Sequence, residues 1–253
     1  MLHVHDLKFS RGREFTLQVA DWRASPGHVQ AVLGTNGAGK STFLKLLCGE
    51  EAPTGGDIRL HGQRLQDWSA LERARHLGVL PQASSLSFAF SAEEVVSLGL
   101  TPLNTGWRNA QQTVRAVMRA TDCAHLAKKP YPRLSGGERQ RIHLARVLVQ
   151  LSQAEHAPVL LLDEPTSAQD LGQQHRMLEL ASGLAREHNY AVVAILHDLN
   201  LTLRHTTHCL HLDAGRSVAQ GAPQEVLSTD SIAKYWGYNA QLLHTADGAL
   251  VVA

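Results

Sequence analysis

The most constraining feature of the sequence is a loop at residues 34–42 that fits the pattern G-x-x-x-x-G-K-[ST] at every fixed position. Its residues are Gly34, Thr35, Asn36, Gly37, Ala38, Gly39, Lys40, Ser41 and Thr42. The apolar run Val29 to Leu33 precedes the loop and suits a buried strand, and apolar residues recur at helical spacing from Phe43 to Leu47. Because strand, loop and helix are the context that this pattern requires, the stretch predicts a phosphate-binding loop.

The chemistry of such a loop follows from its residue types. Glycines let successive backbone N–H groups turn inward at the start of a helix, where the helix dipole also favours an anion. We therefore expect Lys40 to reach the β- and γ-phosphates of a bound nucleotide and the Ser41 hydroxyl to hold Mg²⁺. A glycine-rich turn that binds nothing is the alternative, and the matching flanks argue against it.

Composition limits the other possibilities. The 253 residues suit one large domain or one domain with an inserted subdomain. The 24 Lys and Arg residues nearly balance the 23 Asp and Glu residues, so charge gives no reason to expect nucleic acid or a membrane surface as partner. The widely separated Cys48, Cys123 and Cys209 suit a reducing compartment, and we expect the cytosol. With no apolar run of about 18–20 residues, the chain is expected to be neither secreted nor membrane-spanning by itself.

The 15 histidines are numerous but scattered. We interpret the group His3 and His5, and the group His205, His208 and His211, as surface or strand positions rather than as metal ligands. None forms a zinc-binding pattern with the cysteines.

The pattern of apolar residues predicts the order of the elements. Strand-like alternation over Leu2 to Phe9 and Phe15 to Trp22, extended by Asp57 to Leu60, predicts an antiparallel piece. From Ala83 to about Gln150 helical signals replace strand signals, which predicts an inserted helical subdomain. After Pro158, apolar strands and helices alternate, which predicts a largely parallel sheet covered by helices. From about Pro223 we expect two short helices and two strands around a turn at residues 247–248.

Two further polar groups follow apolar strands. Val159 to Leu162 ends in Asp163 and Glu164, at the sheet edge where α/β proteins place ligands. Asp163 could hold Mg²⁺ and Glu164 could polarise the attacking water, although Asp-Glu-Pro can also simply begin a turn. His197 follows the strand Ala191 to Leu196 and could donate to a γ-phosphate, although a lone histidine is usually structural.

A second candidate anion site begins at Leu134-Ser135-Gly136-Gly137-Glu138. Ser135 and Glu138 form a capping box that opens the helix Ser135 to Gln150. Gly136 and Gly137 leave the helix N-terminus uncovered for a phosphate. Because the chain already has one phosphate nest, the second one requires an explanation.

Taken together and in order, six motifs resemble those of the ATP-binding-cassette (ABC) ATPase family. They are the phosphate loop at 34–42, Gln82 at the Q-loop position, the signature at 134–138, the Walker B run at 159–164, the D-loop Ser167-Ala168-Gln169-Asp170 and the switch histidine His197. The resemblance covers the whole chain. It implies an α/β fold of the ABC type, in which a RecA-like, largely parallel sheet is joined by an antiparallel β subdomain and a helical subdomain.

The resemblance also implies the parts of the site. We expect one nucleotide-binding domain over 1–253, with its core in 1–82 and 158–222, the helical subdomain in 83–150 and an extension in 223–253. ATP and Mg²⁺ are the implied cofactors. The implied catalytic residues are Glu164, His197 and Gln82, and the implied metal ligands are Ser41, Gln82 and Asp163. Ser135, Gly136 and Gly137 would contact the γ-phosphate that the other protomer of a homodimer binds.

The sequence departs from the family at two positions. Arg11 stands where a tyrosine commonly stacks on adenine, and Gln169 replaces the usual D-loop leucine. We expect Arg11 to lie over the base by cation–π attraction and stacking. The alternative is that Arg11 points to solvent and another side chain, such as Phe15, meets the base.

Other stretches resemble one group of importers. Phe88 to Val96 and His197 to Asn200 are similar to ATPases that serve importers of siderophores, vitamin B12 and haem, while Arg115 to Cys123 and the connection 148–158 are similar to haemin-import ATPases. We expect an ATP-hydrolysing subunit for haemin uptake on the cytoplasmic face of the inner membrane, with two permease subunits and a binding protein that acts through them. A siderophore or vitamin B12 importer is the first alternative.

Other classes of ABC protein remain as further alternatives. They are a soluble ATPase acting on nucleic acid or the ribosome, and an exporter ATPase. A single cassette without a heptad run or a charge excess argues against a nucleic-acid partner. An attached membrane domain, common in exporters, is not found in this sequence.

Overall fold

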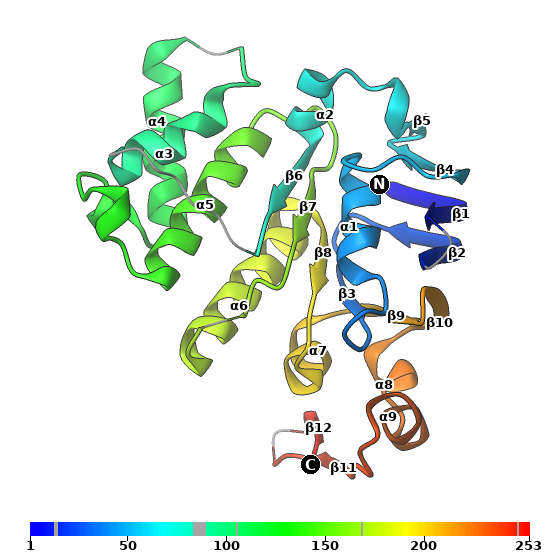
Figure 1. Ribbon diagram of the computed structural model, residues 1–253. Helices are drawn as coiled ribbons and strands as arrows, with labels where there is room; N and C mark the ends of the chain where they lie inside the picture. Colours follow the sequence, from blue (N-terminus) through cyan, green and yellow to red (C-terminus); the bar gives the residue numbers. More distant parts are fainter. Residues whose placement is uncertain (13–14, 83–89, 105, 168, 247) are drawn as a thin grey trace.

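The structure is a computed structural model that describes residues 1–12, 15–82, 90–104, 106–167, 169–246 and 248–253 (Figure 1). Phe88 and Ala89 of the importer-like stretch, residue 168 of the D-loop and residue 247 of the expected last turn lie outside this part. No helix in the described part of the chain is long and apolar enough to cross a membrane.

A ten-stranded sheet runs through the molecule in the order β5-β4-β1-β2-β10-β9-β3-β8-β7-β6. Its strands are β1 (Leu2–Arg11), β2 (Phe15–Ala24), β3 (Val29–Leu33), β4 (Gly55–Leu60), β5 (Gln63–Arg64), β6 (Leu77–Leu80), β7 (Val159–Leu162), β8 (Ala191–Ile195), β9 (His208–Asp213) and β10 (Arg216–Gly221). Strands β6, β7, β8, β3 and β9 pair in parallel, whereas β1 pairs antiparallel with β2 and β4. The expected α/β class with an antiparallel piece is confirmed.

Helices cover both faces of the parallel strands (Figure 1). The helices within the described residues are α1 (Lys40–Cys48), α2 (Ala70–His76), α3 (Ala92–Ser97), α4 (Trp107–Ala120), α5 (Gly136–Leu151), α6 (Leu171–His188), α7 (Leu199–His205), α8 (Pro223–Val226) and α9 (Thr229–Trp236), with short 3₁₀ turns η1 (Leu65–Asp67), η2 (Leu98–Leu100), η3 (Ala124–Leu126) and η4 (Tyr131–Arg133). A separate hairpin of β11 (Leu242–His244) and β12 (Leu250–Val252) ends the chain.

Strand β10 was not expected from the sequence. Its residues alternate between exposed and half-buried along its whole length, so it has no apolar run to reveal it. It pairs antiparallel with β9 and meets β2 in parallel through Arg216 and Gln18. This strand joins the antiparallel piece to the parallel sheet.

Period-2 alternation divides the core between the two faces of the sheet. Val32, Leu161 and Val193 pack with α1 and the antiparallel strands on one face. Their immediate neighbours, such as Leu160 and Val192, pack with α5, α6 and α7 on the other. Because neighbouring strand residues point to opposite faces, strands buried on both faces read as continuous apolar runs.

Helix α5 belongs to two cores. Leu144, Val147 and Leu148 pack against the sheet. Ile142 and Ala145, on another side of the helix, pack with α3, α4 and the turn at Tyr131 in a third cluster. We call α3, α4 and the turns packed with them the helical layer. This layer is attached to the sheet through α5, on the side away from the antiparallel strands (Figure 1).

The contact between η2 and α5 predicts the outcome of one substitution. A Cβ atom at Gly99 would lie 2.1 Å from the carbonyl oxygen of Arg146 in α5, so Gly99→Ala must push the helical layer away from α5. We expect a loss of about 1–3 kcal/mol in the free energy of unfolding, measured by urea denaturation. Gly183→Ala in α6 is the control, because its Cβ would meet nothing within 4 Å. Equal unfolding midpoints for the two variants would contradict this packing.

Candidate nucleotide site

The phosphate loop requires glycine at two positions, Gly34 and Gly39. Strand β3 is buried at all five positions and leads into Gly34, whose φ is 145°. A Cβ there would lie 2.2 Å from the carbonyl oxygen of Leu212. Gly39 has φ 105°, and its Cβ would lie within 3.2 Å of Leu17 and Phe15. The loop therefore lies close to the backbone of β9 at Gly34 and to side chains of β2 at Gly39.

Helix α1 begins within this loop, at Lys40, without a capping side chain. Gly39 is the N-cap residue, and the first turn has no acidic residue. The backbone N–H groups of the first turn lack intrahelical partners, and an uncapped helix start can give them to an anion. This is the geometry that the sequence pattern predicts for binding phosphate.

Lys40 is buried at the base of the loop. Its Nζ donates to the carbonyl oxygens of Gly34 at 2.8 Å and Thr35 at 3.0 Å. Burial lowers the pKa of Lys40, and the carboxylates of Glu164 and Asp163 oppose that change. An ammonium group held by two carbonyl oxygens is available to a phosphate that approaches the loop.

A cleft of about 390 Å³ lies over the loop. The described residues that line it are Arg11, Phe15, Asn36, Gly37, Gly39, Lys40, Ser41, Thr42 and Glu164. The cleft thus brings together the phosphate loop, one of the two carboxylates and both candidate base-contacting side chains.

Asp163 and Glu164 follow β7 at the edge of the sheet. The backbone N–H of Asp163 donates to the carbonyl oxygen of Leu80 at 2.9 Å, and Glu164 has φ 47°. A non-glycine residue in the left-handed region stores strain, which occurs most often at functional sites. The chain therefore turns sharply at Glu164.

Asp163 has the character of a metal ligand. Its Oδ1 is buried and has no hydrogen-bond partner among the described residues. Burial raises the pKa of Asp163, and the charge of Glu164 adds to the increase. Carboxylate, hydroxyl and amide oxygens are the ligands that Mg²⁺ takes, so the donors of Asp163, Ser41 and Gln82 fit this ion chemically.

The structure brings together three residues that the sequence predicted to be catalytic. Gln82 Nε2 donates to Glu164 Oε2 at 2.6 Å, and His197 Nε2 lies 2.8 Å from Glu164 Oε1. Each follows a different strand: β6, β7 and β8, respectively. Both carboxylate oxygens of Glu164 are thereby oriented by side chains from neighbouring strands.

The Arg11 side chain contacts Glu51 and Phe9. Its guanidinium pairs with Glu51 and lies 5.9 Å from the centre of the Phe9 ring. Phe15 approaches Gly39 at the loop itself. Both side chains that the sequence offered as platforms for the adenine ring, Arg11 and Phe15, therefore line the cleft.

Ser135, Gly136 and Gly137 are not among the described residues that line the cleft. Ser135 Oγ accepts from the Glu138 backbone N–H at 3.3 Å, and Glu138 Oε2 accepts from the Ser135 backbone N–H at 2.7 Å. That backbone hydrogen bond, with the ammonium of Lys129, lowers the pKa of Glu138 to about 2. The expected capping box is present, and its two glycines have open space around them.

A glutamine chain that sequence reasoning missed connects α5 to the segment after Glu164. Gln140 in α5 donates to the carbonyl oxygen of Pro165 at 2.6 Å and accepts from Gln169. Gln174 donates to the carbonyl oxygen of Gln169 at 3.1 Å. The sequence marked Gln169 as unusual, but nothing in it pointed to Gln140.

Comparison with known proteins places the chain in a family. The ABC transporter family matches residues 17–167. The "Hemin import ATP-binding protein HmuV" of Shewanella denitrificans is 47% identical over 250 residues, which cover 99% of this chain and 98% of that protein. The protein of the same name from Pseudomonas entomophila is 49% identical over 237 residues, 94% of this chain and 92% of that one.

A solved structure agrees with this placement. The structure of cbiO1 from Clostridium perfringens, part of the ABC transporter complex cbiONQ, has a TM-score of 0.80 at 26% identity and covers 92% of each chain. This agrees with the sequence motifs, the fold and the cleft. We conclude that the chain is an ATPase of the ABC transporter family.

Proposed function

We propose that this chain is the ATP-hydrolysing subunit of an importer that takes up haemin across the inner membrane. The observation that carries the proposal is the extent of the likeness to hemin import ATP-binding proteins, which spans 99% of this chain at 47% identity. Such a likeness includes α4 and the α5–β7 connection, far in sequence from the phosphate loop. A siderophore or vitamin B12 importer would use the same ATP site with another permease.

The phosphate loop binds the triphosphate of ATP in this proposal. Lys40 exchanges its two backbone carbonyl partners for contacts with the β- and γ-phosphates, and the N–H groups at the start of α1 supply the rest of the cradle. Ser41, Gln82 and Asp163 would hold Mg²⁺. Bound there, the ion would neutralise charge on the phosphate oxygens.

Glu164 is the proposed base for hydrolysis. Its carboxylate would accept a hydrogen bond from the attacking water and polarise it. Gln82 and His197 hold that carboxylate from two sides, which fixes its direction before the nucleotide arrives. Once a γ-phosphate is present, His197 can donate to it instead and so report its presence.

Arg11 is proposed to stack on the adenine ring of ATP, with Phe15 as the alternative stacking partner. Release of the Glu51 pair would free the guanidinium to stack, and an exposed ion pair of this kind costs little to break. Neither stacking nor phosphate contact depends on the groups that distinguish adenine from guanine. We therefore expect weak discrimination between ATP and GTP.

Two chains are proposed to close on two ATP molecules as a symmetric homodimer. Ser135, Gly136 and Gly137 form an open helix start away from the cleft of their own chain. In a twofold assembly the same surfaces meet reciprocally, so each signature can reach the γ-phosphate that the other chain holds. Closure then depends on γ-phosphate contacts, and hydrolysis reverses it.

In this proposal the chain works against permease subunits in the membrane. In the proposed division of the chain into a core (1–82 and 158–222), a helical subdomain (83–150) and an extension (223–253), Gln82 is the last residue of the first core segment, directly before the helical subdomain. Gln82 and the segment 83–105 would transmit closure to two permease subunits. A binding protein would act through the permease, and this chain would sit on the cytoplasmic face of the membrane.

Glu164→Gln should keep ATP binding and lose turnover. The amide is isosteric and can still lie beside Gln82 and His197, but it cannot act as a base. We expect kcat to fall by roughly 10²-fold or more, while the Kd for ATP, measured calorimetrically, changes little. Glu187→Gln, at an exposed position of α6, is the control. Near wild-type turnover in Glu164→Gln would remove this residue from the mechanism.

Lys40→Ala and His197→Ala should separate binding from catalysis. Removing the ammonium deletes a charged contact in the bound ground state, so we expect the Kd for ATP to rise by about tenfold or more. Removing the imidazole should chiefly lower kcat and leave the Kd within a few-fold. Large and equal losses of affinity in both variants would argue against His197 as a γ-phosphate sensor.

The cargo is tested by reconstitution with the permease and binding protein that belong to this chain. ATP turnover should rise above its basal rate when haem-loaded binding protein is added, and the isolated chain should bind no haem. The same vesicles carrying Glu164→Gln are the control for turnover by other proteins. Stimulation by a siderophore or by cobalamin instead of haem would overturn the cargo while leaving the ATPase role intact.

A further inference from the structure

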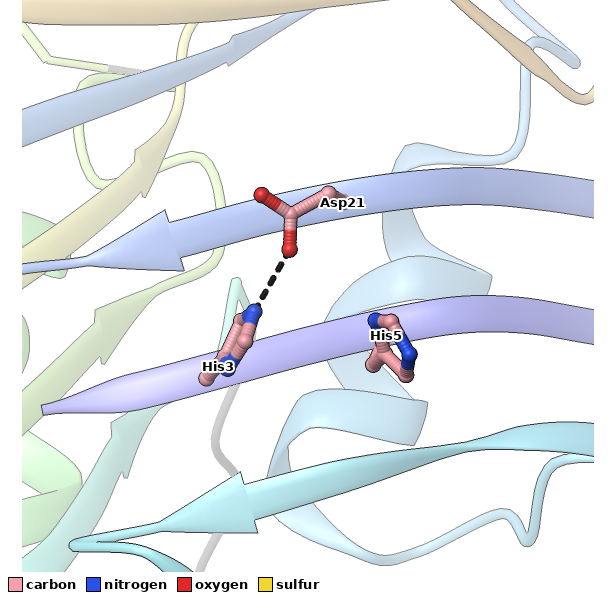
Figure 2. A group of neighbouring side chains, drawn as sticks. All are labelled: His3, His5 and Asp21. Carbon is pink, nitrogen blue, oxygen red and sulfur yellow. Dashed lines mark hydrogen bonds and ion pairs between the residues drawn. The ribbon is translucent and has the colours of Figure 1, made fainter.

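Three side chains with metal-binding atoms meet on the outer face of the antiparallel strands (Figure 2). His3 and His5 stand on β1, and Asp21 stands on the neighbouring β2. One ligand atom from each lies within 4.8 Å of the other two. His3 Nε2 is 2.5 Å from Asp21 Oδ1, and the two imidazole rings have centroids 6.1 Å apart.

The buried face of the sheet fixes this arrangement. Val4 pairs with Trp22 across β1 and β2, and both side chains are buried. His5 pairs with Asp21 in the same ladder. Because a slip of one residue would move Val4 and Trp22 into solvent, the register that holds the three donors is strongly set.

We propose that His3, His5 and Asp21 form a binding site for a divalent transition-metal ion, with Zn²⁺ as the ion that suits it. Two imidazoles and one carboxylate are typical ligands for Zn²⁺, and three protein ligands leave a fourth position for water. Mg²⁺ prefers oxygen ligands, so the site is distinct in chemistry from the nucleotide site.

The three donors are close to the spacing that the ion requires. Ligand atoms about 2.0–2.1 Å from a tetrahedral Zn²⁺ lie about 3.3 Å from one another. The most widely spaced donors must therefore approach by at most about 1.5 Å, whereas His3 Nε2 and Asp21 Oδ1, now 2.5 Å apart, must separate by about 0.8 Å. Rotation of exposed side chains can supply both movements. The side chains of His5 and Asp21 are 63% and 54% exposed, so both can turn.

The surrounding charges leave Asp21 available to an ion. Asp57 on β4 faces His5 but already accepts from Arg59 Nε at 2.8 Å, with Arg64 nearby. Arg23 Nε is 3.9 Å from Asp21 Oδ2, a longer and exposed contact. Asp6 Oδ2 lies 3.8 Å from His5 Nε2 and adds negative charge on the other side.

A proton competes with the metal for this site. The hydrogen bond from His3 lowers the pKa of the Asp21 carboxyl, which favours the ionised form that can bind a metal. Because a metal ion binds only the unprotonated form of each ligand, its affinity should fall as the pH is lowered. Asp6 and Asp57 favour a cation at this face, whereas Arg23 and Arg59 oppose it.

The experiment titrates tag-free, full-length protein with Co²⁺, in the absence of nucleotide and Mg²⁺. We expect one Co²⁺ ion to bind tightly per chain and to give visible ligand-field bands. Added Zn²⁺ should displace the Co²⁺ and abolish these bands. His3→Gln, His5→Gln and Asp21→Asn should each weaken Co²⁺ binding by about tenfold or more. Because no nucleotide is present, the result does not depend on the proposed transport function.

The matched control is His208→Gln. Exposed His208 and half-buried His28 form another imidazole pair, with ring centroids 4.9 Å apart, and they lie outside the three-residue group. This variant should still bind one Co²⁺ ion tightly, and circular dichroism should show all four variants folded. Co²⁺ affinities that are the same in the wild type and the three ligand variants would overturn the site, as would a wild type that binds no Co²⁺ ion tightly.

Discussion

The parallel register of β6, β7 and β8 is the constraint on which the site depends. Leu80 pairs with Leu162, and Leu162 pairs with Ala194. Gln82 and Glu164 each stand two residues beyond their paired strand positions, so their side chains meet at the same edge of the sheet. His197 follows Ala194 at nearly the same distance. The hydrogen bonds to both oxygens of Glu164 are thus a consequence of strand pairing.

The same edge explains the glycines of the phosphate loop. β3 lies between β8 and β9, and the chain after it must turn at Gly34 where the carbonyl oxygen of Leu212 leaves no space for a Cβ. Helix α1 can then start beneath the cleft with its first N–H groups free of side-chain caps. The cleft lies beside Glu164 for three reasons: the order of the strands, the close approach of Gly34 to β9, and the start of α1.

Helix α5 connects this fixed edge to the helical layer. It packs against the sheet on one side and against α3 and α4 on another, and it begins at the Ser135 nest. Gln140 joins the same helix to Pro165, next to Glu164. A rearrangement at Glu164 on loss of the γ-phosphate would therefore reach both the signature of this chain and its helical layer.

Much of this organisation could be predicted from the sequence, because several features are each formed by contiguous residues. They are the phosphate loop, the strand before Asp163 and the capping box at Ser135. The parallel strands were recognisable because burial on both faces makes them continuously apolar. Strand β10 was missed, since its residues alternate between exposed and half-buried and so form no such run. Contacts between distant residues, such as Arg11 with Glu51 or His3 with Asp21, depend on pairing that spacing alone does not encode.

If each ATP site is completed by the signature of a second chain, as proposed, two inactive variants of this chain should complement each other in a mixed dimer. Lys40→Ala disables the phosphate loop, and Gly137→Asp puts a negative charge in the signature nest, where an added side chain has open space. In a mixed dimer, the intact loop of one chain faces the intact nest of the other. The mixture is expected to hydrolyse ATP faster than the sum of the two variants measured separately. Full activity of Gly137→Asp alone, or a mixture no faster than that sum, would contradict the proposal.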